Sequence, residues 1–139
     1  GCPKRFSTAG GMGSALLETP ETLLAIVQSL LSVHPRVSVK MRLLREEGAT
    51  ERLVSRLASS GIWALTIHGR TRHDTYDVPS SAASIERLAR LAKSVNPQLQ
   101  VFASGDIFPL QGRSLALLQQ PRQGAELARC AAPGSAADD

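Results

Sequence analysis

A cysteine set against a proline opens the chain, in the run GCPKRFS at residues 1–7. A glycine-dense stretch, Gly10–Gly13, follows and leads into an apolar segment. Glycines let the backbone approach a ligand closely, and the start of a following helix offers unpaired N–H groups to an anion. The spacing predicts a loop that carries a reactive thiol, Cys2, over a surface that binds an anion or a flat ring.

Further residues able to do chemistry come where three apolar runs end. They are Lys40 and Arg42, then His68, Arg70 and Arg72, then Ser104, Gly105 and Asp106. A lysine or histidine in such a place can donate to an anionic ligand, and histidine titrates near pH ~6.5. The competing interpretations are structural: a lysine that reaches solvent, a histidine satisfied within the core, and a solvated charged loop.

The elements that must hold these residues alternate between strand and helix. An incomplete first unit consists of the loop at residues 1–15 and a helix over about 20–33, with Thr19 as its N-cap and Pro20 in its first turn. Strands are expected at 37–43, 63–68 and 99–103. Helices are expected at about 50–60, 82–95 and 110–120, and residues 131–139 are expected to form a disordered tail.

This alternation predicts an α/β fold of about four βα units with parallel strands. Barrel enzymes and doubly wound sheets both place their chemistry at the carboxyl ends of the strands. Periodicity alone leaves the choice between them open.

Four segments, taken in order, resemble the tRNA-dihydrouridine synthases, the flavin enzymes that reduce uridine in tRNA. The segments are residues 1–17, 37–44, 65–72 (LTIHGRTR) and 102–108 (FASGDIF). The GCPK-x-FS form looks most like the eukaryotic branch that acts at position 20 of the D-loop. The resemblance implies a (β/α)8 TIM barrel, of which residues 1–130 would form a partial FMN-binding domain. Such a fragment is expected to bind FMN weakly or not at all.

The resemblance also implies roles for single residues. Cys2 would protonate C5 of uracil while C6 receives hydride from FMN that NADPH has reduced. The residues expected to bind FMN are Lys40, His68, Ser104, Gly105, Asp106 and Arg129. Those expected to contact tRNA are Lys4, Arg42, Arg70 and Arg72, with a salt bridge as the alternative for Arg42. Ser104 replaces the asparagine usual in the family, and the lost amide is expected to weaken flavin binding by about 1–2 kcal/mol.

Composition limits the class of protein. The net charge of +4 and the pI near 9.7 suit an anionic partner such as RNA. No apolar run is long enough to span a bilayer. Cys2 and Cys130 lie too far apart for a CxxC metal or redox motif, so no metal is expected and both are interpreted as thiols in the cytoplasm. The chain is expected to be a monomer or to require the missing half-barrel.

Two other functions stay open at this point. One is a catalytically inactive remnant that only binds RNA or a partner, which the absent first half and Ser104 favour. The other is a different FMN barrel that acts on free pyrimidines, for which the GCPK-x-FS loop is not expected.

Overall fold

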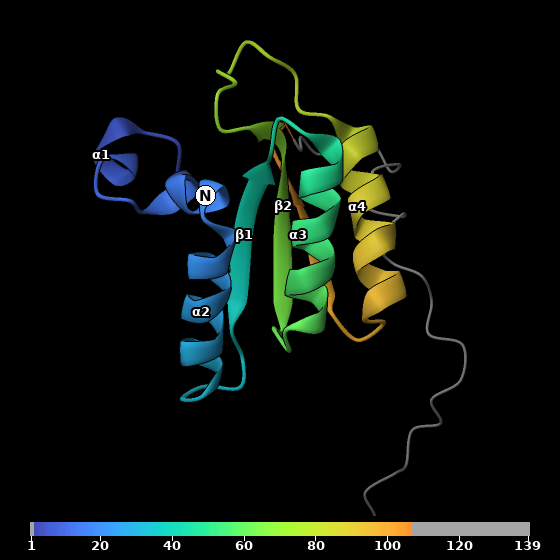
Figure 1. Ribbon diagram of the computed structural model, residues 1–139. Helices are drawn as coiled ribbons and strands as arrows, with labels where there is room; N and C mark the ends of the chain where they lie inside the picture. Colours follow the sequence, from blue (N-terminus) through green and yellow to red (C-terminus); the bar gives the residue numbers. More distant parts are fainter. Residues whose placement is uncertain (1, 107–139) are drawn as a thin grey trace, which may run out of the picture.

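The computed structural model describes residues 2–106, in which three parallel strands form one sheet in the order β1-β2-β3 (Figure 1). The strands are β1 (Ser38–Leu43), β2 (Ala64–Thr71) and β3 (Gln100–Ser104). The longer helices are α2 (Pro20–Leu31), α3 (Glu47–Ser59) and α4 (Ala82–Val95), and two short turns, α1 (Arg5–Thr8) and η1 (Gly13–Glu18), precede them. The predicted parallel α/β sheet is confirmed for this part of the chain.

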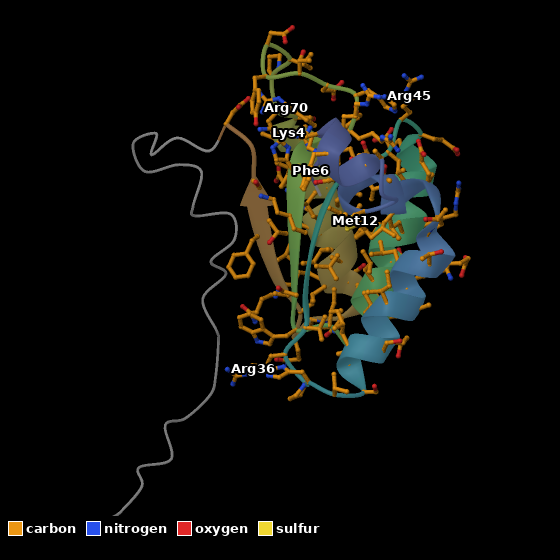
Figure 2. All side chains as sticks on the ribbon, turned by 90° about the vertical axis from the view of Figure 1, so that its left-hand side faces the viewer. Lys4, Phe6, Met12, Arg36, Arg45 and Arg70 are labelled. Carbon is orange, nitrogen blue, oxygen red and sulfur yellow. The ribbon has the colours of Figure 1, made fainter. Side chains whose placement is uncertain are left out.

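The three longer helices lie on one face of the sheet and leave the other face without a helix (Figures 1 and 2). Each strand pairs with the next strand along the chain, and each connection runs through a helix on the same side. A doubly wound sheet instead carries helices on both faces. The described part of the chain is therefore wound in one direction only.

The hydrophobic core lies between this sheet and its helices. Alternate strand residues point into the core, so Met41, Leu65 and Ile67 are almost completely buried. Residues at helical spacing meet them from α3 and α4, including Leu57 and Leu88. The helix α2 contributes less than its apolar pattern predicts, because Val27 is buried there while Ile26 and Leu30 are exposed. The core is thus centred on β2, α3 and α4.

The start of one predicted helix and the cap of another differ from the structure. The helix α3 begins at Glu47 rather than near residue 50, because the buried Thr50 hydroxyl accepts from the Leu44 N–H and donates to the Glu46 carbonyl. Thr19 stands at the N-cap position of α2, yet its side chain makes no capping hydrogen bond. Pro20 does occupy the first turn of α2, as predicted.

The strand β2 continues past its predicted end at His68. Arg42 pairs with His68, but the next residue, Leu43, pairs with Thr71, so the register shifts by a bulge that contains Gly69 and Arg70. A bulge redirects the side chains that follow it. The stretch predicted as a charged loop therefore begins inside the sheet.

Some expectations fall outside the described residues. They are the helix over 110–120, the tail at 131–139, the domain boundary at residue 130 and the FMN-binding role of Arg129. Among the described helices, none has the length and apolar character needed to cross a membrane.

We expect Leu57→Ala to lower the free energy of unfolding by about 2–5 kcal/mol, because Leu57 is fully buried and its removal leaves a cavity. Leu30→Ala is the matched control, since Leu30 is 47% exposed on α2 and its loss should cost less than about 1 kcal/mol. Urea unfolding followed by circular dichroism measures both. Equal losses would contradict a core centred on α3 and the sheet.

Candidate functional site

The helix-free face of the sheet gathers polar side chains into two layers. Parallel pairing places Lys40 beside Thr66 and Thr66 beside Phe102. The next layer, closer to the carboxyl ends, holds Arg42, His68 and Ser104 in the same way. Residues opposite one another in register project from the same face of a sheet. Three residues that the sequence predicts at an FMN site, namely Lys40, His68 and Ser104, therefore share one face.

Lys40 is exposed on this face. It lies within β1, which ends at Leu43 as predicted, and residue 40 belongs to the helix-free side. The ammonium group is thus presented to solvent, where it can meet an anionic ligand without a large desolvation penalty.

His68 lies half-buried at the centre of the second layer. Its Nδ1 accepts a hydrogen bond of 3.3 Å from the backbone N–H of Arg70. Burial lowers the pKa of His68, and the nearby charges of Arg42, Arg70 and Lys40 lower it further, while Asp106 acts in the opposite direction. The ring is accordingly neutral at physiological pH.

Two glycines close the loops around His68. Gly105 has φ +96°, and a Cβ added there would lie 2.7 Å from Ser80 Oγ and 2.8 Å from the His68 ring. A Cβ on Gly69 would lie 2.3 Å from the same Ser80 oxygen. The Ser80 hydroxyl is buried and, within residues 2–106, has no hydrogen-bond partner. The turn after β3 and the loop before α4 thus meet at atomic contact through positions that only glycine fits.

Three of the four residues predicted to contact tRNA point into the protein instead of forming an exposed basic rim. The Arg42 Nη1 donates to the Thr71 carbonyl at 2.8 Å, which is neither of the two roles predicted for it. The Arg70 guanidinium is 4% exposed and pairs with Asp106 at 2.7 Å. Arg72 pairs with Glu18 at 2.7 Å. These arginines use the planar guanidinium to tie loops together, and their contact with tRNA stays a prediction.

Two protein groups hold the Asp106 carboxylate. Its Oδ2 accepts from Arg70 Nη2 at 2.7 Å and from the Ser80 N–H at 2.9 Å. The Ser80 N–H and then the Arg70 guanidinium hold the pKa of this carboxyl below its usual value. Its side chain is engaged with protein groups, and its predicted place in an FMN site stays a prediction.

Cys2 is exposed in the loop before α1, held against η1, which itself contacts β1. The Ser14 N–H at the start of η1 donates to the Cys2 carbonyl at 3.0 Å. Gly13 permits this closure, since it has φ +62° and a Cβ there would lie 2.6 Å from the Cys2 carbonyl oxygen. The glycine-dense stretch therefore fixes the backbone of the cysteine while the thiol stays open to solvent.

Hydrogen bonds make this thiol more acidic than an ordinary cysteine. The Ser7 side chain and then the Lys4 backbone lower the pKa of Cys2, and the Lys4 charge acts in the same direction. A general acid acts best when its pKa lies near the working pH, and this shift moves the pKa of Cys2 in that direction.

Other groups escaped the sequence analysis. Ser7 beside the thiol ends the GCPK-x-FS motif but was given no role, and Ser80 between the two glycines belongs to no motif. Arg5 and Phe6 lie next to Lys4 on the short turn α1, and all three are exposed, with Phe6 90% exposed. An exposed aromatic beside cations is typical of surfaces that stack on nucleic-acid bases. Figure 2 shows Lys4, Phe6 and Arg70 toward the carboxyl end of the strands.

The donor set on the helix-free face fits a flat, phosphate-bearing cofactor. Lys40 offers a positive charge, and neutral His68 and Ser104 offer hydrogen bonds in the neighbouring layer. Residues 2–106 contain no group of three histidine, cysteine or acidic side chains placed to hold a metal ion.

The sequence model of the family described as dihydrouridine synthase (Dus) matches residues 1–133. A tRNA-dihydrouridine(20) synthase [NAD(P)+] of Saccharomyces cerevisiae is 49% identical over 75 residues, which are 50% of this chain and 20% of that protein. One of the same name from Schizosaccharomyces pombe is 30% identical over 112 residues, 77% of this chain and 23% of that protein. A probable tRNA-dihydrouridine synthase of Rhodobacter capsulatus is 32% identical over 133 residues, 93% and 39% respectively. The chain thus spans well under half the length of these relatives.

Gly105→Ala should displace the turn after β3 from His68, because the added methyl group meets both Ser80 and the His68 ring. Gly11→Ala is the control, because Gly11 has φ +71° but no atom within 4 Å of an added Cβ. Its loss of unfolding free energy therefore measures only the cost of a positive φ in a residue with a side chain, about 1–2 kcal/mol. We expect the unfolding free energy to fall more for Gly105→Ala, and the His68 ring signals to shift only in that variant. Matching losses and unchanged His68 signals would contradict the close packing.

Alkylation of Cys2 by iodoacetamide should reach half its maximal rate at a lower pH than alkylation of a free cysteine. Ser7→Ala should move this midpoint upward, because it removes the main cause of the lowered pKa of Cys2. Peptide mapping by mass spectrometry separates Cys2 from Cys130. Thr8→Ala, one residue along the same turn, is the control and should leave the midpoint in place.

Proposed function

This chain belongs to the dihydrouridine synthase family, and we propose that it carries part of an FMN-dependent enzyme that reduces the C5–C6 double bond of uridine in the D-loop of tRNA. The observation that carries the proposal is the shared placement of Lys40, His68 and Ser104 on the helix-free face, with the acidified Cys2 thiol in an exposed loop at the edge of the same sheet. NAD(P)H is the source of electrons that the names of the two yeast relatives support.

We propose that the sheet is part of a (β/α)8 barrel, with the helix-free face turned toward its interior. Single winding and helices on one side are features of such barrels. A groove beside the outer edge of β1, lined by residues such as Ile26, Leu30 and Val39, leaves apolar surface in the open. A further βα unit on that edge would cover this surface and pair the edge strand.

Four residues of the chain would have separate roles in the proposed reaction. Lys40 would place its positive charge beside the cofactor, and His68 with Ser104 would hold it by hydrogen bonds at the carboxyl end. FMN supplies the hydride when it is bound. Cys2 would hold a proton on Sγ and transfer it to C5 of the uracil ring, after which a proton from solvent restores the thiol. The target uridine would leave its stack to reach this site.

The partner is tRNA, and the exposed cations near the thiol are the groups on the described surface that would meet its phosphates. Lys4 and Arg5 fill this role on α1, where Arg42, Arg70 and Arg72 do not. The names of the two yeast relatives support uridine 20 as the target. The proposed place of action is the cytoplasm, where cysteines stay reduced.

Cys2→Ala should abolish dihydrouridine formation in the whole protein that carries this sequence, while FMN binding persists, because the change removes the proton donor and no cofactor ligand. The measurement is mass spectrometry of nucleosides from tRNA of a strain without its own synthase. Cys130→Ala is the matched control and should keep the activity. Full activity of Cys2→Ala would contradict the assignment of the proton donor.

Lys40→Met should weaken FMN binding about 10- to 100-fold, as expected when one charged hydrogen bond of about 1.5–3 kcal/mol is lost. Flavin fluorescence titration measures this affinity. Lys93→Met is the control, because Lys93 lies on α4, on the other side of the sheet. Similar FMN affinities for the two variants would contradict the proposal that FMN binds beside Lys40 on the helix-free face.

A further inference from the structure

The buried guanidinium of Arg70 joins three segments at the carboxyl end of the sheet. Its Nε donates to the Val78 carbonyl at 2.5 Å, and its Nη2 donates to the Tyr76 carbonyl at 3.1 Å. The same Nη2 donates to Asp106 Oδ2 at 2.7 Å. One side chain therefore holds the loop between β2 and α4 and the turn after β3 together.

Asp106 completes this connection from the other side. It has φ +50° and is the single non-glycine residue in the left-handed region within residues 2–106. That conformation is unfavourable for a residue with a side chain. The carboxylate is held by Arg70 and by the Ser80 N–H, and Gly105 beside it lies against the His68 ring. The pairing thus fixes the turn that forms one wall around His68.

Arg70 also acts on His68 through its own backbone. Its N–H donates to His68 Nδ1, so the proton of the neutral ring belongs on Nε2. Within residues 2–106 no protein group is bonded to that Nε2. The ring is therefore a ready donor of one hydrogen bond to an oxygen of a ligand.

We propose that Arg70 is a positioning residue, which holds His68 as a neutral Nε2–H donor aimed at an oxygen of the cofactor and takes no part in binding RNA. The proposal rests on the proposed function for the identity of the ligand. The proposal gives Asp106 the same positioning role, because its carboxylate pairs with the Arg70 guanidinium. The bulge after His68 is what turns the Arg70 side chain into this buried place.

The titration of His68 distinguishes this role from a simple change of charge. The charges that face His68 are Lys40 and Arg42 from β1, Arg70 from β2 and Asp106 after β3. Removing the Asp106 charge alone would lower the pKa of His68 further. Opening the turn would instead raise the pKa of His68, because burial is the main cause that holds it down. The two effects have opposite signs.

The experiment is long-range ¹H–¹⁵N NMR of the chain without cofactor, which reports both the pKa and the tautomer of each histidine. In Asp106→Gly, which tolerates the positive φ, the His68 pKa should rise and the Nε2–H tautomer should lose its dominance. Arg70→Lys keeps a positive charge but loses the planar guanidinium that bonds Val78, Tyr76 and Asp106, and it should have the same effect. Asp77→Asn is the control, because it removes a carboxylate from the same loop without adding backbone freedom between the Tyr76 and Val78 carbonyls. It should change neither property, and His73 serves as an exposed reference.

FMN affinity is the second measurement. It should fall about tenfold in Arg70→Lys and in Asp106→Gly, the change expected when one ligand hydrogen bond is misplaced. A His68 pKa that stays or falls in both folded variants would overturn the proposal. Loss of RNA affinity in Arg70→Lys with an unchanged His68 would overturn it in favour of an RNA contact. If the unaltered whole protein does not bind FMN, the proposed function fails, while the titration still decides the role of Arg70.

Discussion

The parallel register of β2 with its two neighbours is the constraint on which the rest of the structure depends. It places Leu65 and Ile67 in the core and, by strict alternation, Thr66 and His68 on the opposite face. A slip of one residue would exchange these faces, burying polar groups and exposing the core. The hydrophobic effect that fixes the core therefore also fixes the place of the candidate site, without any separate interaction to align it.

The bulge at Gly69 and Arg70 changes this regular pattern at the point where chemistry is expected. In a regular strand, the residues after His68 would go on alternating between the two faces. The register shift instead turns Arg70 into the protein, where it meets the carbonyls of the loop ahead of it and Asp106. Bulges are common next to active sites because they re-aim side chains in this way. Asp106 itself has an unfavourable positive φ, and hydrogen bonds from Arg70 and Ser80 hold its carboxylate.

Much of the fold was predictable from the sequence. The burial and the hydrogen-bond partners of the polar side chains were less predictable. The strands and α4 follow from apolar runs and their spacing, which are local properties, and the predicted bounds of α4 agree with the structure. That Lys40, His68 and Ser104 share a face follows from the same alternation. The burial of Arg70 was not predictable, because its partners are backbone carbonyls and an aspartate 36 residues away. A run of charged residues does not by itself show which of its side chains will be buried by a turn that is distant in the sequence.

The contrast between arginine and lysine shows how the site keeps charge available for a ligand. The guanidinium is a planar fork that can satisfy several carbonyls at once, so it is suited to hold loops together when buried. Arg42, Arg70 and Arg72 are used in this way, and each is bonded to a protein oxygen. The ammonium of lysine is a strongly hydrated point charge that gains less from burial, and Lys4 and Lys40 are both exposed. The carboxylate of Asp106 is paired with Arg70, so its negative charge is compensated. The positive charges of the exposed lysines are therefore available to attract a phosphate.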